Sequence, residues 1–174
     1  MRGLFREIFS WLKYFIAAIA IGLILNATVV ASAVVISSSM ENTIMTDGRV
    51  MGLRLSYVFS DPERFEVILF DPPDDAESLP FVKRIIGLPG ETVLIIDGRV
   101  YIDGSTTPLS EPYLAETPVG SFGPVVVPAE SFFVMGDNRN RSNDSRHWEN
   151  TFVPRDSIIG RLFFQFFPSF NYFG

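Results

Sequence analysis

Residues 81–102 read FVKRIIGLPGETVLIIDGRVYI, and this stretch decides the fold that we expect for most of the chain. Three short runs in it are rich in β-branched residues, as strands are: Phe81–Ile86, Thr92–Ile96 and Arg99–Ile102. Pro89-Gly90 ends the first run, and Asp97-Gly98 joins the other two. Because Asp-Gly between β-branched runs favours a type I′ turn, the second and third runs predict a hairpin.

The sequence on either side continues this pattern. Further candidate strands are Arg49–Leu55, Glu66–Phe70, Val125–Val127, Phe132–Met135 and Ile158–Phe167. Residues 105–124 and 138–145 are rich in turn-forming and small polar residues and predict loops. Many short strands with frequent turns predict an all-β domain over residues 36–174, built as a partly closed barrel or sandwich.

The N-terminus predicts a membrane anchor. Residues 14–35 carry no charge, and as a helix they would span about 33 Å, enough to cross the hydrocarbon core of a bilayer. The preceding basic residues predict that residues 1–13 are cytoplasmic and that the domain after residue 35 lies outside the cell membrane. A cleavable signal peptide shares the basic start, but its apolar part is shorter, roughly 7–15 residues.

Composition removes several classes of function. The chain has a formal net charge of −6 and no basic block, which argues against nucleic-acid binding. It has no cysteine, so disulfides, thiolate metal sites and a thiol nucleophile are excluded. Its one histidine, His147, would have to serve any Ser-His-Asp triad, although beside Trp148 it reads better as a stacked or capping residue.

Lys83 is a candidate base. It lies at the centre of its predicted strand, where alternation places it on the same face as Phe81 and Ile85. A lysine on an apolar face loses hydration, which lowers its pKa and leaves a neutral amine near neutral pH. The alternative is an edge-strand lysine whose amine reaches water.

The serines Ser37–Ser39 are candidates for a nucleophile and a hydroxyl donor, since acyl transfer needs both. Their position directly after the predicted anchor also fits a plain polar linker or a helix cap. Asp137 and Asp144 lie in a loop among several arginines, which predicts ion pairs rather than a metal site.

These residues converge on a family. The chain resembles type I signal peptidases, the Ser-Lys proteases of peptidase family S26 that cut signal peptides from exported proteins. Ser37–Thr43 is similar to the motif S-x-S-M-x-P-T, Lys83–Glu91 to K-R-V-I-G-L-P-G-D, Gly136–Arg146 to G-D-N-R-D-N-S-x-D-S-R, and Asp47–Val50 to a weaker G-D-x-V. Among its departures from these motifs, Asn42 replaces proline, Glu91 aspartate, Asn140 aspartate and Arg141 asparagine.

The resemblance implies a role for each matching residue. Ser39 is the nucleophile and Lys83 the general base, while the Ser37 hydroxyl and the Ser39 backbone N–H form the oxyanion hole. The resemblance also implies residues that support the site: Ser142, which hydrogen-bonds and orients the Lys83 amine, and an ion pair of Asp144 with Arg146. It implies no metal and no cofactor. The short segment between the second and third motifs implies that residues 92–127 are only a β-ribbon or loop insertion.

The implied partners are membrane lipid and the signal peptides of secretory preproteins, cut after a small-x-small sequence. The peptide would add as a strand between the segment before Ser37 and the strand Phe81–Lys83. We expect four apolar residues to line its pockets: Met40, Ile44, Phe81 and Val82. A dedicated peptidase with few substrates and a non-enzymatic tethered β-domain remain alternatives, and the second predicts that Ser39 and Lys83 lie far apart.

The last 13 residues contain six phenylalanines and one tyrosine. This aromatic tail predicts either a core strand followed by an aromatic plug or a surface that enters the bilayer interface.

Overall fold

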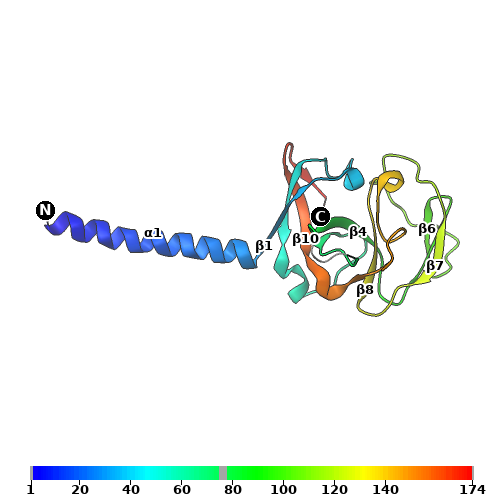
Figure 1. Cartoon of the computed structure of the whole chain (residues 1–174), viewed down its shortest axis with the longest axis horizontal. Helices are drawn as coiled ribbons and strands as arrows, with labels where there is room; N and C mark the ends of the chain where they lie inside the picture. Colours follow the sequence, from blue (N-terminus) through cyan, green and yellow to red (C-terminus); the bar gives the residue numbers. More distant parts are fainter. Residues whose placement is uncertain (1, 75–77, 174) are drawn as a thin grey trace. The chain divides into compact units, whose positions relative to one another are not determined.

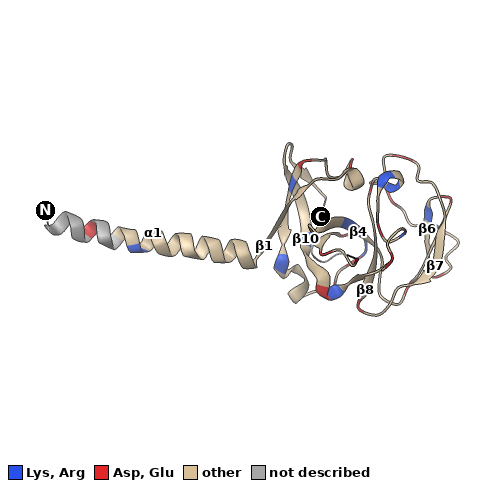
Figure 2. Cartoon of the chain, in the orientation of Figure 1, with Lys and Arg blue, Asp and Glu red and all other residues tan. Residues whose placement is uncertain are grey.

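The N-terminal segment forms one helix, α1 (Arg2–Thr28). The computed structural model describes residues 2–74 and 78–173, and it divides the chain into two units, residues 1–30 and 31–174. Trp11–Thr28 is long and apolar enough, by length and composition, to cross a membrane. Figure 2 shows no charged residue on α1 after Lys13. The predicted apolar helix is therefore present.

The helix ends earlier than expected. We predicted a span over residues 14–35, but Val30–Val35 forms strand β1. Four of the residues from 29 to 35 are valines, whose branched side chains lose freedom in a helix and suit a strand. Hydrogen bonding of β1 to β2 (Gly48–Leu53) supplies the partner that makes the strand favourable.

The main sheet has eight strands. Besides β1 and β2 these are β3 (Val67–Phe70), β4 (Phe81–Gly87), β8 (Ser131–Met135), β9 (Val153–Pro154), β10 (Ile158–Phe167) and β11 (Asn171–Tyr172). The order is β1-β2-β10-β3-β4-β8-β9, with β11 paired to β10. Figure 1 shows the sheet curling around its interior, so the all-β, partly closed architecture is confirmed.

A second sheet has three strands in the order β6-β5-β7. Its strands are β5 (Thr92–Ile96), β6 (Arg99–Ile102) and β7 (Phe122–Val126). The turn between β5 and β6 has φ of 48° at Asp97 and 78° at Gly98, the two positive values that a type I′ turn requires. The predicted hairpin is thus confirmed, and β7 starts inside the segment that we expected to be a loop.

Short 3-10 helices connect the strands: η1 (Ser38–Met40), η2 (Arg54–Val58), η3 (Arg139–Arg141) and η4 (Arg155–Ser157). Because η2 starts at Arg54, the strand that we expected to reach Leu55 ends at Leu53. β4 lies between β3 and β8 and is buried from Val82 to Gly87. This central strand carries the two buried cations around which the site is built.

The aromatic tail divides between core and surface. Leu162 and Gln165 of β10 are fully buried, so its first part is a core strand, as one interpretation predicted. Phe167, Phe170 and Tyr172 are more than half exposed. They do not form a buried plug.

Candidate active site

Ser39 is held by the turn η1, which follows β1. The neighbouring Met40 is fully buried, and its carbonyl accepts the Ile44 N–H at 2.7 Å, so the turn is anchored in the core. Asn138 fixes the turn from outside, since its N–H donates to the Ser39 carbonyl at 3.0 Å and its side chain donates to Ser38. Ser39 itself is only 5% exposed.

Lys83 comes from β4, where it pairs in register with Ile68 of β3. Ile68 and Ile85 belong to one buried cluster with Phe81 packed against it, and the Lys83 amine lies 5.8 Å from the Phe81 ring centre. Lys83 therefore shares the apolar face that alternation predicted, and it is only 4% exposed. It is not an edge lysine that reaches water.

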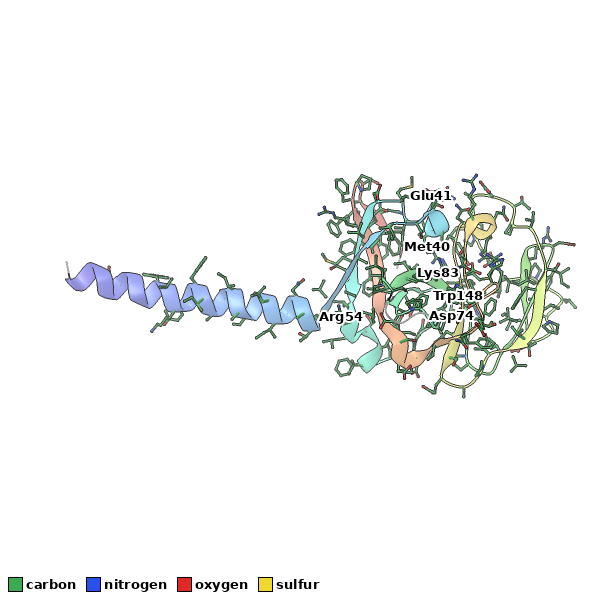
Figure 3. All side chains as sticks on the ribbon, in the orientation of Figure 1. Met40, Glu41, Arg54, Asp74, Lys83 and Trp148 are labelled. Atoms are coloured by element: carbon green, nitrogen blue, oxygen red, sulfur yellow. The ribbon has the colours of Figure 1, made fainter. Side chains whose placement is uncertain are left out.

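The structure brings the two candidates together. Lys83 Nζ donates to Ser39 Oγ at 2.5 Å, across 44 positions of sequence. Figure 3 shows Lys83 close to Met40, at the point where β4 approaches η1. The prediction of a tethered binding domain, that these side chains lie far apart, is wrong.

Burial gives this lysine the properties of a base. Loss of hydration lowers the pKa of Lys83 to about 8, although the carboxylates of Asp144 and Asp137 act in the opposite direction. About one tenth of the amine is then neutral at pH of about 7 and can accept a proton. Arginine at this position could not do so.

The two other serines of the predicted site, Ser37 and Ser142, differ in their contacts. Ser37 Oγ lies 3.2 Å from Ser39 Oγ, so a hydroxyl donor stands beside the candidate nucleophile, as expected. The predicted bond from Ser142 to Lys83 is not formed, and the buried Ser142 hydroxyl lies beside Asp144, whose pKa it helps to lower. Ser142 packs against Gly136, and a methyl group on that glycine would overlap both Ser142 and the Ser39 carbonyl.

The ion pair of Asp144 with Arg146 is present. Arg146 Nε and Nη2 donate to the two carboxylate oxygens at 2.8 and 2.9 Å, and the Gly136 N–H donates to the same group at 3.0 Å. Burial alone would raise the pKa of Asp144, but the hydrogen bonds and charge of Arg146, together with Ser142 and the Gly136 N–H, hold it below its usual value. Asp144 is therefore a buried carboxylate anion near Lys83.

A second buried ion pair was not predicted as part of the site. Arg84, which follows Lys83, donates from Nε and Nη2 to Asp137 at 2.8 and 2.6 Å, and the Thr43 hydroxyl also donates to Asp137. Arg139 in turn pairs with Glu111. All but Glu111 lie in motifs quoted from the sequence, but only the fold shows which charges meet.

A cleft of about 560 Å³ opens beside Ser39 and Lys83. Residues 32–39 line one part of it, residues 79–83 another, and the lining is completed by Arg54, Leu69, Arg141, Asn143 and Ile159. Phe81 and Val82 line this cleft as expected. Met40 and Ile44 do not, and this correction has a simple cause: both point from the turn into the core and are fully buried.

His147 is not the partner of Ser39. Its side chain is 56% exposed, and its Nδ1 lies 3.9 Å from Asp144. Within the described part of the chain, Ser39 Oγ instead meets Lys83 and Ser37.

Comparison with known proteins agrees with this geometry. Residues 8–167 match the family model described as signal peptidase, peptidase S26. A probable signal peptidase I-2 of Synechocystis sp. is 39% identical over 166 residues, which cover 91% of this chain and 74% of that protein. A signal peptidase I of Bacillus licheniformis is 34% identical, covering 93% and 90% respectively. The crystal structure of a signal peptidase I from Enterococcus faecalis matches with a TM-score of 0.50 and 38% identity, over 59% of this chain and 97% of that one. This chain belongs to the signal peptidase family, peptidase S26.

Proposed function

We propose that this chain is a membrane-bound serine endopeptidase that removes signal peptides from exported preproteins after a small-x-small sequence. The observation that carries the proposal is the buried contact of 2.5 Å between Lys83 Nζ and Ser39 Oγ. A serine hydroxyl is a weak nucleophile unless a base removes its proton. Lys83 supplies that base, since burial lowers its pKa to about 8.

The reaction proceeds through an acyl-enzyme. Neutral Lys83 takes the Ser39 proton as Oγ attacks the carbonyl carbon of the scissile bond. The Ser37 hydroxyl and the Ser39 N–H donate to the oxyanion that develops. The Lys83 ammonium then protonates the leaving amine of the substrate. Lys83, now neutral again, activates the water that hydrolyses the ester.

The substrate is an extended peptide in the cleft described above. β1 is the terminal strand of the sheet order, so its free edge can pair with an added strand. Alternate side chains of that strand point toward the cleft wall formed by Phe81 and Val82. Small side chains at two alternate positions before the cut suit this arrangement.

Membrane lipid is the second partner. The basic residues before α1 favour a cytoplasmic N-terminus with the β-domain on the opposite side of the membrane. Ser39 follows the end of α1 at Thr28 by 11 residues, which span at most about 40 Å. The chain itself therefore keeps the nucleophile near the bilayer from which a signal peptide emerges.

Cleavage of a preprotein with an Ala-x-Ala site, in detergent, tests this function. The wild type should cut after the second alanine, and Ser39→Ala, Lys83→Ala and Lys83→Arg should be inactive while remaining folded. Ser110→Ala, in an exposed loop, is the matched control and should be fully active. Retained activity in Lys83→Ala would remove the lysine from its role and make His147 the next candidate. A wild type that cuts no preprotein would contradict the enzyme assignment.

A further inference from the structure

Arg141 is the unpaired cation of the loop near the active site. Its neighbours Arg139 and Arg146 are committed to Glu111 and Asp144. The side chain of Arg141 is exposed and makes no ion pair or hydrogen bond to any residue that the structure describes.

Arg141 and Asn143 lie where two cavities meet. Both line the substrate cleft together with Ser39 and Lys83, and both line a neighbouring cavity of about 440 Å³. The rest of that cavity is formed by Val119, Arg139, Asn140, Ser142, Arg146 and His147. Of the described residues that line it, none is a carboxylate, and three are arginines. Because Arg139 and Arg146 are already paired with Glu111 and Asp144, the positive charge that this space offers to a ligand is that of Arg141.

We propose that this neighbouring cavity receives the first residues of the mature protein, and that Arg141 favours an acidic side chain among them. The inference rests on the proposed function. The signal-peptide side of the substrate fills the cleft between residues 32–36 and 79–82, and the chain must continue past Ser39 after the scissile bond. Arg141 borders the space on that continuation, and its guanidinium is free to bind a carboxylate.

The test compares substrates within one enzyme. A preprotein with an Ala-x-Ala site is prepared with Asp, Ala or Lys at each of the first three positions after the cut. For the wild type we expect kcat/KM to be about threefold to tenfold higher with Asp than with Lys at one of these positions, the size expected for exposed charges that attract in one case and repel in the other. The ratio should fall toward one between about 0.1 M and about 1 M salt, because the screening length drops from about 10 Å to about 3 Å.

Two variants assign the effect to Arg141. Arg141→Asn, the family residue, should bring the Asp-to-Lys ratio near one, and Arg141→Glu should invert it. Each ratio is measured within one variant, so a loss of folded enzyme cancels. Arg99→Glu makes the same change in net charge on the three-stranded sheet, outside both cavities, and should keep the wild-type ratio.

A wild-type ratio near one on substrates that are cleaved would overturn this inference and leave the proposed function standing. So would a preference for Asp that survives in Arg141→Glu. Failure to cleave any of the substrates would overturn both.

Discussion

The dependence of cleavage on pH follows directly from the environment of Lys83. Only the neutral amine can take the Ser39 proton, and burial lowers the pKa of Lys83 to about 8. Because the neutral form is the active one, kcat/KM should rise with pH through about 8 and then level off. The profile of kcat/KM reports groups of the free enzyme, which is the state that the structure describes.

The expected change is large. Two units of pH centred on the pKa take the neutral fraction from about one tenth to about nine tenths, so kcat/KM should rise about tenfold between pH of about 7 and about 9. An unperturbed lysine, with a pKa of about 10.4, would be neutral in only about one molecule in a few thousand at pH of about 7. Its profile would still be climbing steeply at pH of about 10.

The variant Asp144→Asn tests the assignment more sharply. The Asp144 carboxylate raises the pKa of Lys83 and the Arg146 charge lowers it. Removing the carboxylate and leaving Arg146 should therefore move the rise in kcat/KM to lower pH. The shape of the profile does not depend on how much enzyme is active, so it can be read even if the variant is less stable.

The assay is cleavage of an Ala-x-Ala preprotein in detergent across the range from about pH 6 to about pH 10. A wild-type rise near 10 would refute the claim that burial activates Lys83. A rise that stays in place or moves to higher pH in Asp144→Asn would show that the group being titrated is not the lysine beside this carboxylate.

Three further substitutions test the packing around the site. Asp137→Asn leaves the buried Arg84 without its anion, so the free energy of unfolding measured by urea denaturation should fall by about 3–5 kcal/mol; a loss below about 1 kcal/mol would contradict the importance of this pair. Gly136→Ala places a methyl group against the Ser39 carbonyl. The resulting displacement of Ser39 should lower kcat/KM by about 100-fold. Activity close to that of the wild type would show that the turn can shift without harm. Phe133→Ala empties a fully buried site and should lower the free energy of unfolding by about 3–5 kcal/mol with the pH profile of the remaining folded enzyme unchanged.

Local sequence predicted the strands well where the residue pattern fits a strand and not a helix. The run TVLIIDGRVYI formed the expected hairpin because Asp97-Gly98 can take the two positive φ values that the turn needs. The run Val30–Val35 was assigned to the membrane helix because an uninterrupted apolar stretch suits a helix and a buried strand equally. Its strand state depends on pairing with β2, a partner that local sequence does not reveal.

In the site, too, local sequence predicted some features, whereas others depend on contacts between distant segments. Alternation along one strand was enough to place Lys83 on an apolar face, because that rule concerns only its own neighbours. Met40 and Ile44 were misplaced because Met40 ends a three-residue 3-10 turn and Ile44 follows in the next turn, and such short segments have no periodicity that shows which side chains enter the core. The contacts of Ser142 depend on how a loop packs more than 50 residues from Lys83, which no local pattern fixes.

The adjacent cations Lys83 and Arg84 have different partners and different tasks in the site. Consecutive strand residues point to opposite faces, so Lys83 hydrogen-bonds to Ser39 on one face while Arg84 forms an ion pair with Asp137 on the other. Asn138, which follows Asp137 in the loop, donates its backbone N–H to the Ser39 carbonyl. Thr43, which follows the turn that carries Ser39, donates its hydroxyl to Asp137. The strand therefore presents Lys83 to Ser39 and also fixes, through the ion pair of Arg84 with Asp137, the loop and turn that hold Ser39 in place.

A shift of one residue in the pairing of this strand would exchange its two faces. It would place a permanently charged arginine beside Ser39 and the lysine amine beside Asp137. The pairing of β4 with β3 and β8 is thus as necessary to the proposed chemistry as the side chains of Ser39 and Lys83 themselves.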